Sequence, residues 1–320
     1  MAPLRTVYIA GHTGLVGSAL LRHFTSLGAR VVGVVRGELD LTRQAAVEEF
    51  LHRESPDAVI VAAGRVGGIQ ANASFPAQFI YENVMIEANL IHASWKAGVK
   101  RLLNFGSSCM FPKICPQPME LSHLMAGRME PTSEPYAIAK WAGLSMCRAY
   151  NRQYGTQYLT AIPCTLFGPG DSFHLQDAHV ISALLRKFHE VKRQNLSRVV
   201  LWGTGRPRRE FLYVEDLARA CELLLALESP PEGPILIGSG RSYSIHEIAQ
   251  KIAGIVGFQG EIAWDPSQPD GAPEKLLDST QIRRLGWIPR ISFEEGISKT
   301  YRWFLENEPQ IGLMEPSCAS

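Results

Sequence analysis

A glycine-rich turn near the amino terminus constrains the fold of this chain more than any other feature. The apolar run 7–10 leads into Gly11, Gly14 and Gly17 at three-residue spacing, and apolar residues then recur with helical periodicity up to Leu27. Glycines at this spacing allow the backbone to turn tightly and approach a pyrophosphate, whose charge lies at the helix amino terminus. A second apolar run at 31–35 follows. The turn therefore predicts a dinucleotide-binding strand–helix–strand unit, the alternative being a glycine-rich turn that binds nothing.

The same alternation of apolar strands and helices continues as far as Pro163. It is typical of a parallel sheet with helices on both faces, the doubly wound α/β architecture. The elements predicted here are strands at 58–62, 101–105 and 158–162 and helices at 44–53, 75–97 and 136–154.

Beyond Pro163, proline and glycine cluster and the strict alternation ends. We predict strands at 199–202 and 235–238 and helices at 179–192, 215–227, 245–256 and 293–305. The expected organisation is a nucleotide-binding Rossmann domain of residues 1–165, with a return over roughly 210–240, and a smaller α+β substrate lobe within 166–320. The last residues before Ser320 are expected to form a frayed tail.

Composition excludes several classes of partner. The 320 residues include 32 basic and 31 acidic side chains, so no global field attracts nucleic acid or an anionic membrane. No apolar run approaches the length of a membrane span, and the amino terminus lacks the features of a signal peptide. The six cysteines have no metal-like spacing, which favours a reducing cytoplasm, mostly buried thiols and no metal site.

A candidate reactive pair lies at Tyr136 and Lys140, which a helix places on one face one turn apart. A neighbouring cation is expected to lower the pKa of the phenol, which makes it a proton donor to a carbonyl near neutral pH. Ser107, at the end of the strand 101–105, is placed to hydrogen-bond the same carbonyl oxygen. The pattern indicates a redox enzyme that acts on a carbonyl.

Two further residues have both a chemical and a packing interpretation. Cys109 follows Ser107 by two residues, where a thiol can act as a base on a carbon next to the carbonyl; otherwise it is a buried packing residue. His179 opens an amphipathic helix, and a histidine at such a place also serves as a helix-end residue. The sequence alone leaves these alternatives open.

The sequence also offers candidate residues for binding the cofactor nucleotide and the substrate. Arg36 follows the second strand, where an arginine suits the 2′-phosphate of NADP, although a solvated surface arginine is the alternative. Asp40 and Leu41 are placed to contact the adenine, and Ala63 ends the third strand beside the cofactor path. The cationic and aromatic residues suited to a substrate diphosphate and base are Lys187, Trp202, Arg208 and Arg209.

Together these motifs resemble the GDP-L-fucose synthases (GDP-4-keto-6-deoxy-mannose 3,5-epimerase/4-reductases) of the extended short-chain dehydrogenase/reductase superfamily. The likeness extends from Val7 to about Glu308. The matching motifs are 66–69 (VGGI), 106–113 (GSSCMFPK), 134–140 (EPYAIAK), 179–180 (HV), 202–205 (WGTG), 209–211 (REF) and 275–278 (KLLD).

The resemblance implies a role for each matching residue. Tyr136 protonates the C4 oxygen as NADPH delivers hydride, Lys140 tunes the phenol and holds the nicotinamide ribose, and Ser107 orients the carbonyl. Cys109 and His179 form the acid–base pair that epimerises C3 and C5. The implied substrate contacts are Ser108, Cys109, Lys187, Trp202, Arg209 and Asp278. The implied cofactor-lining residues are Gly11, His12, Thr13, Gly14, Leu15, Val16, Gly17, Phe105, Gly106, Ser107, Ser108, Tyr136, Lys140, Pro163, Cys164, Thr165, Leu166 and His179.

The chain departs from the family pattern at a few positions. Thr13 stands where the family often has an arginine, which shifts NADP selectivity towards Arg36. Cys164, Thr165, Ser172 and Ala178 also differ, in the segment expected beside the nicotinamide and the sugar. These changes fit either a different keto-sugar or sequence drift within a fucose synthase.

The expected activity is NADPH-dependent epimerisation and 4-keto reduction of a GDP-4-keto-6-deoxy-hexose. One alternative is the GDP-colitose type of reaction, in which only C5 is epimerised, and the other is a catalytically silent NADP-binding sensor. Because the helices at 75–97 and 136–154 are apolar on more than one side, we also expect an isologous homodimer built on them.

Overall fold

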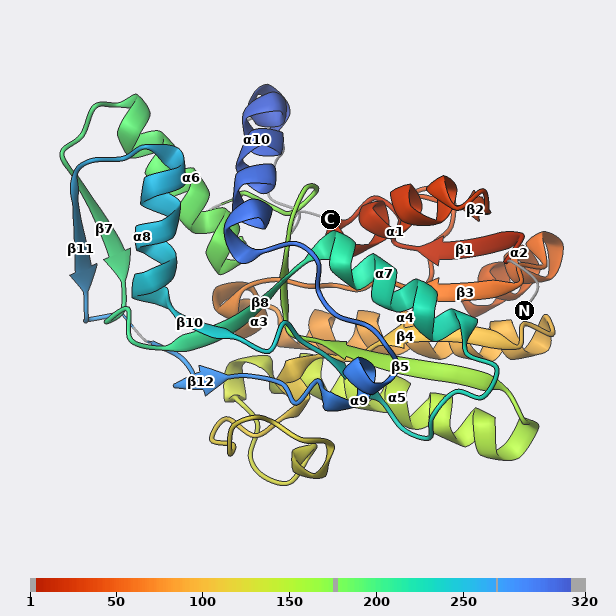
Figure 1. Ribbon diagram of the computed structural model, residues 1–320. Helices are drawn as coiled ribbons and strands as arrows, with labels where there is room; N and C mark the ends of the chain where they lie inside the picture. The colour runs from red at the N-terminus through yellow and green to blue at the C-terminus, as the bar shows by residue number, and fades with distance from the viewer. Residues whose placement is uncertain (1–3, 175–177, 269, 312–320) are drawn as a thin grey trace.

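A six-stranded parallel sheet lies at the centre of the computed structural model, which describes residues 4–174, 178–268 and 270–311 (Figure 1). The strand order is β2-β1-β3-β4-β5-β9, and every neighbouring pair is parallel. The strands are β1 (Thr6–Ala10), β2 (Arg30–Val32), β3 (Ala58–Val61), β4 (Arg101–Phe105), β5 (Gln157–Pro163) and β9 (Ile235–Ile237).

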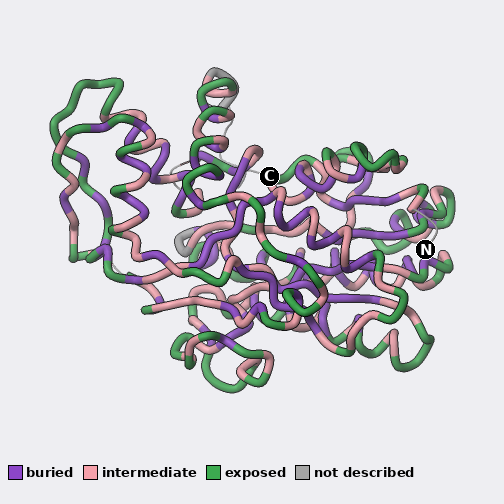
Figure 2. The backbone as a smooth tube through the Cα atoms, viewed as in Figure 1, coloured by how far each residue is buried: buried purple, intermediate pink, exposed green. Residues whose placement is uncertain are grey.

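Successive residues of the strands serve two different cores, because side chains alternate between the faces of a sheet. In β1, Val7 and Ile9 join one buried cluster, whereas Tyr8 and Ala10 join another. Both faces of the sheet are therefore covered, and the backbone of the central strands is largely purple, the colour of buried residues, in Figure 2. The packed helices are α1 (Leu15–Ser26) with α7 (Val214–Ala226), α2 (Gln44–Glu54) with α4 (Pro76–Lys96), and α4 with α5 (Glu134–Tyr154).

A second set of strands lies beside the central sheet, on the left of Figure 1. Its strand β8 (Arg208–Tyr213) pairs with β10 (Ser242–Ser244) in antiparallel fashion and with β6 (Thr165–Phe167) and β12 (Glu274–Lys275) in parallel fashion. A separate parallel pair joins β7 (Arg198–Trp202) to β11 (Glu261–Asp265). The helices that complete this part are α6 (Val180–Arg193), α8 (Ile245–Val256) and α10 (Phe293–Ile311).

Aromatic side chains dominate the buried cluster of this second part. Phe167, Phe211 and Phe293 contact one another at ring-centroid distances of 5.6 to 6.3 Å. Phe173 packs against Phe304 of α10 at 4.7 Å. Such contacts stabilise a core through large buried area, so this part has its own packed interior.

The predicted doubly wound parallel sheet is confirmed. Strand β2 is shorter than the predicted 31–35, because its pairing with β1 ends at Val32. The elements that the sequence did not predict are short, and the strands among them depend on partners distant in the chain. They are α3 (Ile69–Ser74), α9 (Thr280–Arg284), β6, β8, β10, β11, β12 and the 3-10 helices at Ser108–Met110, Leu121–His123 and Pro131–Ser133.

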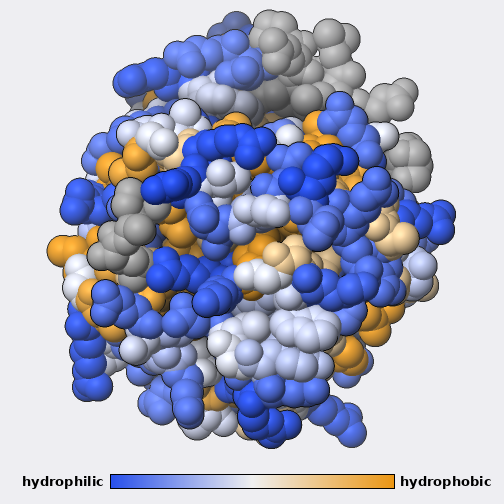
Figure 3. Space-filling model, turned by 90° about the vertical axis from the view of Figure 1, so that its right-hand side faces the viewer, coloured by the Kyte–Doolittle hydropathy of each residue, from blue (hydrophilic) through white to orange (hydrophobic). Residues whose placement is uncertain are grey.

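The described residues contain no helix with the length and apolar character needed to cross a membrane. The side of the molecule that carries the amino terminus is largely hydrophilic, with hydrophobic residues in small separate patches (Figure 3). Cys318 and the predicted tail up to Ser320 lie outside the described residues.

The parallel strands place the motifs identified in the sequence at one edge of the sheet. The glycine turn follows β1, Ser107 follows β4, and Cys164 follows β5. Because neighbouring parallel strands end on the same side, the carboxyl edge of the sheet carries all three segments, and this edge is where doubly wound folds bind ligands.

Candidate active site

The glycine turn after β1 is a backbone structure in which two positions accept only glycine. Gly11 has a φ of +80°, and a Cβ added there would lie 2.7 Å from the Cα of Ala63. A Cβ at Gly17 would lie 2.0 Å from the carbonyl oxygen of Gly11. The Gly14 amide donates to the Gly11 carbonyl at 3.1 Å and so closes the turn.

The amino terminus of α1 fits an anionic group. Its N-cap residue, Gly14, provides no side-chain cap, and the first turn carries no acidic residue. The backbone amides and the positive end of the helix dipole are therefore suited to a phosphate. Thr13 is exposed at this turn, Leu15 and Val16 are partly buried, and the ring of His12 occupies the space beside Gly33.

Arg36 lies on the surface near two other charged groups. Its side chain is 66% exposed, and its guanidinium lies 3.5 Å from Glu82, which also pairs with Arg65 at 3.0 Å. The carboxylate of Asp40 already has partners close in the chain, since it accepts hydrogen bonds from the amide and hydroxyl of Thr42. The backbone bond from Thr42 is the main reason why the pKa of Asp40 is lowered. The Leu41 carbonyl accepts a bond from Asn89 of α4 at 2.8 Å.

Four of the five predicted catalytic residues lie close together. The Ser107 hydroxyl caps the 3-10 helix Ser108–Met110 by accepting from the Cys109 amide at 3.1 Å, and it lies close enough to Tyr136 to lower the pKa of the phenol. The Lys140 ammonium lies 5.8 Å from the centroid of the Tyr136 ring. The Cys109 thiol is near enough to influence the titration of that phenol.

Lys140 acts on the pKa of Tyr136 in the expected direction, by lowering it, but the expected net lowering is wrong, because the pKa of the phenol is raised. Burial raises this pKa, and the opposing effect of Lys140 is too small to reverse the shift. The charges of Cys109 and Glu87 raise it further. The phenol therefore keeps its proton at neutral pH, which is the form that can donate to a carbonyl oxygen.

Glu87, which the sequence analysis did not select, forms a buried ion pair with Lys140. Its Oε1 lies 2.6 Å from Lys140 Nζ, and the two side chains are 1% and 4% exposed. Burial alone lowers the pKa of Lys140, but the charge and hydrogen bond of Glu87, together with the influence of Tyr136, outweigh burial and raise it. A pattern in α4 signals this residue, because Asn83, Glu87 and Ser94 are polar residues on its buried face.

His179 is held by an acidic partner rather than by the group around Tyr136. Its Nδ1 lies 3.4 Å from Asp171, whose other oxygen accepts a hydrogen bond from Ser182 at 2.5 Å. The hydrogen bond that the imidazole donates to Asp171, together with the charge of this carboxylate, raises the pKa of His179 and outweighs burial, which lowers it. Among the described residues, the ion pair of His179 is with Asp171, and the sequence analysis did not select this carboxylate.

The backbone after β4 and β5 is closely packed. A Cβ at Gly106 would lie 2.8 Å from Ile162, and Phe105 is buried. The Cys164 amide donates to the Ile237 carbonyl at 2.9 Å, while its thiol belongs to the main core cluster. Burial raises the pKa of this thiol well above its ordinary value, so it remains protonated. Pro163, Thr165 and Leu166 are partly buried.

The candidate substrate residues come from α6 and the second set of strands. Lys187 lies 5.3 Å from the ring centroid of Trp202, which is 63% exposed, and burial lowers the pKa of Lys187. Arg209 is paired in register with Lys275 across β8 and β12, and burial lowers its pKa. Asp278 follows β12, and its carboxylate accepts hydrogen bonds from Thr280.

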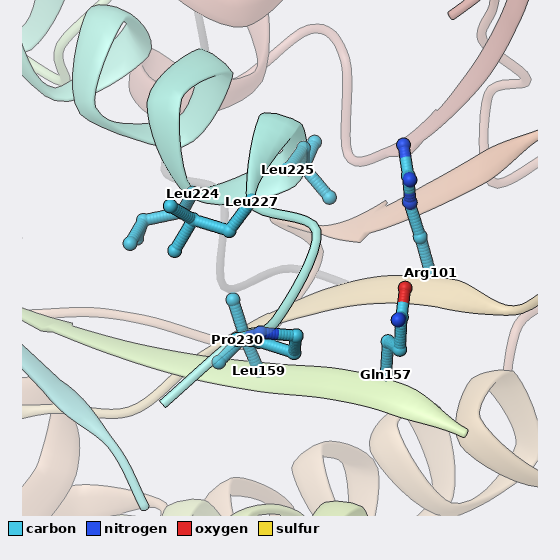
Figure 4. A pocket seen from close by; sticks show the side chains of 7 residues that line it. All are labelled: Arg101, Gln157, Leu159, Leu224, Leu225, Leu227 and Pro230. Atoms are coloured by element: carbon cyan, nitrogen blue, oxygen red, sulfur yellow. The ribbon is translucent and has the colours of Figure 1, made fainter. Parts of the chain in front are cut away.

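The pocket in Figure 4 lies at the opposite end of the sheet. Arg101 and Gln157, the first residues of β4 and β5, line it together with side chains at the end of α7. It contains none of the predicted site residues. Among the described residues, no group of three His, Cys, Asp or Glu side chains could hold a metal ion.

Comparison with known proteins places these residues in a family context. Residues 7–238 match the model of the NAD dependent epimerase/dehydratase family. The GDP-L-fucose synthase of Escherichia coli (strain K12) is 49% identical over 94% of this chain and 97% of that protein. The GDP-L-colitose synthase of Yersinia pseudotuberculosis is 36% identical over 94% of this chain and 98% of that protein.

A solved structure agrees with the sequence comparison. A GDP-L-fucose synthetase from Naegleria fowleri, bound to NADP, is 28% identical with a TM-score of 0.88. The match covers 97% of this chain and 95% of that one.

Proposed function

The chain belongs to the NAD dependent epimerase/dehydratase family and, within it, to the GDP-L-fucose synthases, and from this premise we propose that it converts GDP-4-keto-6-deoxy-D-mannose to GDP-L-fucose. It is an oxidoreductase and epimerase that uses a nicotinamide cofactor. The observation that carries the proposal is the gathering of Ser107, Cys109, Tyr136 and Lys140 beyond the end of β4. A proton donor, a base and an orienting hydroxyl suit a reaction that alters both a ketone and its neighbouring carbons.

The cofactor in this proposal is NADPH. The turn Gly11–Gly17 and the start of α1 receive the pyrophosphate, and the requirement for glycine at two of its positions supports that fit. Arg36 meets the 2′-phosphate, and Lys140 holds the nicotinamide ribose. When bound, NADPH supplies the hydride for C4.

Reduction relies on three side chains. Ser107 orients the C4 carbonyl, and Tyr136 donates its proton to the C4 oxygen. The raised pKa of the phenol supports this role because the proton stays in place until the oxygen becomes more basic. Lys140 stabilises the phenolate that the transfer leaves behind.

Epimerisation relies on Cys109 and His179. The ketone at C4 acidifies the protons on C3 and C5, so a base can remove each one and an acid can return a proton to the opposite face. Because Asp171 favours the protonated imidazole, we assign His179 as the acid and Cys109 as the base. Closure of the second lobe around the sugar is part of this proposal.

The second lobe binds the GDP part of the substrate. Lys187 and Arg209 are cations whose burial favours a negatively charged partner, which a diphosphate provides. The exposed ring of Trp202 offers a surface for the guanine or ribose. Asp278 completes the contacts from the segment after β12.

Two alternatives remain testable. In the GDP-colitose type of reaction the substrate has no hydroxyl at C3. The GDP-L-colitose synthase is, however, a more distant relative of this chain, at 36% identity. The buried, protonated thiol of Cys164 favours sequence drift at that position rather than a new sugar contact. A silent NADP-binding sensor has no use for five reactive side chains.

The test is a spectrophotometric assay at 340 nm with NADPH. We expect rapid loss of absorbance with GDP-4-keto-6-deoxy-D-mannose and slow loss with its 3-deoxy counterpart. The reverse order would favour the colitose type of reaction, and no loss with either sugar would favour a sensor.

Cofactor selectivity has its own test. Arg36→Ala should raise KM for NADPH about tenfold to a hundredfold, the value of a charge-assisted hydrogen bond, and leave KM for NADH nearly unchanged. Arg43→Ala is the matched control, because Arg43 is 79% exposed and pairs only loosely with Asp40 at 3.7 Å. Equal changes in both KM values for Arg36→Ala would contradict the assignment of the 2′-phosphate.

We propose a homodimer built on α4 and α5, acting in the cytoplasm. The exposed hydrophobic side chains Tyr81, Ile138 and Tyr154 on these two helices support this arrangement. A second copy would cover them.

A further inference from the structure

The ion pair between Glu87 and Lys140 lies close to the reactive phenol, with Lys140 Nζ 5.8 Å from the centroid of the Tyr136 ring. The two charged atoms are 2.6 Å apart and nearly inaccessible to solvent. A buried ion pair is a weak source of stability, because desolvation cancels most of the attraction. Its presence next to Tyr136 therefore calls for an explanation in terms of the site.

Helix α5 has a gap that matches the Glu87 carboxylate. A Cβ at Gly143 would lie 1.5 Å from Glu87 Oε2, so no larger residue fits there while Glu87 keeps its place. Gly143 follows Lys140 by three residues and so lies on the same face of the helix. Asn104 of β4 donates to the same Oε2 at 3.2 Å. One carboxylate oxygen thus binds Lys140, and the other accepts from β4 and occupies the space that Gly143 leaves on α5.

We propose that Glu87 is a positioning residue that fixes the Lys140 ammonium and keeps the proton on the Tyr136 phenol over the working pH range. The inference rests on the proposed reductase role of Tyr136 and Lys140. Burial raises the pKa of Glu87, while the charge of Lys140 and hydrogen bonds from Lys140 and Asn104 lower it and favour the carboxylate. With Glu87 ionised, Lys140 charged and the phenol neutral, the buried group carries no net charge. Loss of a proton from Tyr136 would leave a buried net negative charge, and this is unfavourable.

The other titratable groups around this pair are few. Cys109, on the 3-10 helix, influences Tyr136, and Cys147, further along α5, is influenced by Glu87. Burial raises the pKa of Cys147 to about 12, so its thiol is uncharged at neutral pH. Glu87 is therefore the acidic side chain that compensates Lys140 in the described part of the chain.

Replacement of Glu87 by glutamine should shift the pH at which this site loses a proton in a defined direction. The change leaves the Lys140 charge without compensation, so either Lys140 or Tyr136 releases a proton at lower pH than before. The two groups titrate as a coupled pair, and the midpoint moves to lower pH whichever one loses the proton. The shift should be about one pH unit or more, the size expected for a charge this close.

The experiment measures this titration in two ways. The first is the alkaline limb of kcat/KM for NADPH oxidation, in the wild-type protein and in Glu87→Gln. The second is the phenolate absorbance at 295 nm, taken as the difference between each protein and its Tyr136→Phe counterpart. We expect both midpoints at lower pH in Glu87→Gln, with kcat/KM at pH 6 within a few-fold of wild type.

Two further variants distinguish a role of Glu87 in positioning Lys140 from a role in packing alone. Gly143→Ala displaces the carboxylate without removing its charge and should move both midpoints in the same direction. Asp216→Asn is the control, a buried carboxylate of α7 that accepts from the Arg290 and Ile291 amides away from the site. It should lower Tm and leave the midpoints unchanged.

Unchanged midpoints in both Glu87→Gln and Gly143→Ala would overturn the inference. The inference would also be overturned if kcat/KM fell by the same factor at every pH and Tm were lower, since this result would mean that Glu87 serves only the packing of the protein. The absorbance titration needs no substrate, so it still decides the inference if the proposed sugar fails to react.

Discussion

Tyr136→Phe should reduce the rate of NADPH oxidation by about 10² to 10⁴-fold, the usual contribution of a positioned proton donor. The variant should still catalyse exchange of sugar protons with solvent deuterium, because that exchange depends on Cys109 and His179. The phenyl ring keeps its edge contact with Phe79, 6.3 Å between centroids, so the site should keep its shape. Stopped-flow absorbance at 340 nm and NMR of the keto-sugar in deuterated water measure the two activities.

Tyr158→Phe provides the matched control. Its hydroxyl donates to the Val99 carbonyl at 2.9 Å inside the core, and the change removes the same atom as the catalytic variant. It should cost about 1 kcal/mol of stability and leave kcat unchanged. If Tyr136→Phe lost exchange together with reduction while remaining folded, the division of roles proposed here would be incorrect.

Cys109→Ala should strongly reduce the deuterium exchange that Tyr136→Phe retains. Without the thiolate no base removes the protons at C3 and C5, so exchange should fall by about 10² to 10⁴-fold. NADPH oxidation should also slow, because the epimerised ketone no longer forms. The phenol, Ser107 and Lys140 are unchanged, so any residual reduction should yield a sugar that has not been epimerised.

Cys115→Ala is the control for the loss of a thiol from the same stretch of chain. Cys115 is a partly buried free cysteine, and burial raises its pKa, so it is a poor base. Its variant should exchange and reduce at rates close to those of the wild-type protein. Exchange at the wild-type rate in Cys109→Ala would exclude the thiol as the base.

The parts of this structure that are local in sequence could be predicted. The glycine turn is recognisable because its glycines lie three residues apart, and Gly11 and Gly17 are required by contacts with the segment after β3 and within the turn. Tyr136 and Lys140 are recognisable as a pair because helical geometry fixes their relation. The parallel sheet follows from continuous apolar strands, which are buried on both faces.

The parts that depend on distant contacts could not be predicted in the same way. Glu87 and Lys140 are 53 positions apart, and only the packing of α4 on α5 brings them together. In the second set of strands, β8 pairs with three short strands that lie before and after it in the chain. The net pKa of Tyr136 depends on burial, which no local pattern reports.

The most direct test of the central claim is NMR of the product formed from GDP-4-keto-6-deoxy-D-mannose and NADPH in deuterated water. We expect GDP-L-fucose with deuterium at C3 and C5 and with protium, delivered as hydride, at C4. A reduced sugar that carries no deuterium at C3 and C5 would show that one site does not combine epimerisation with reduction, and the proposed function would then be wrong.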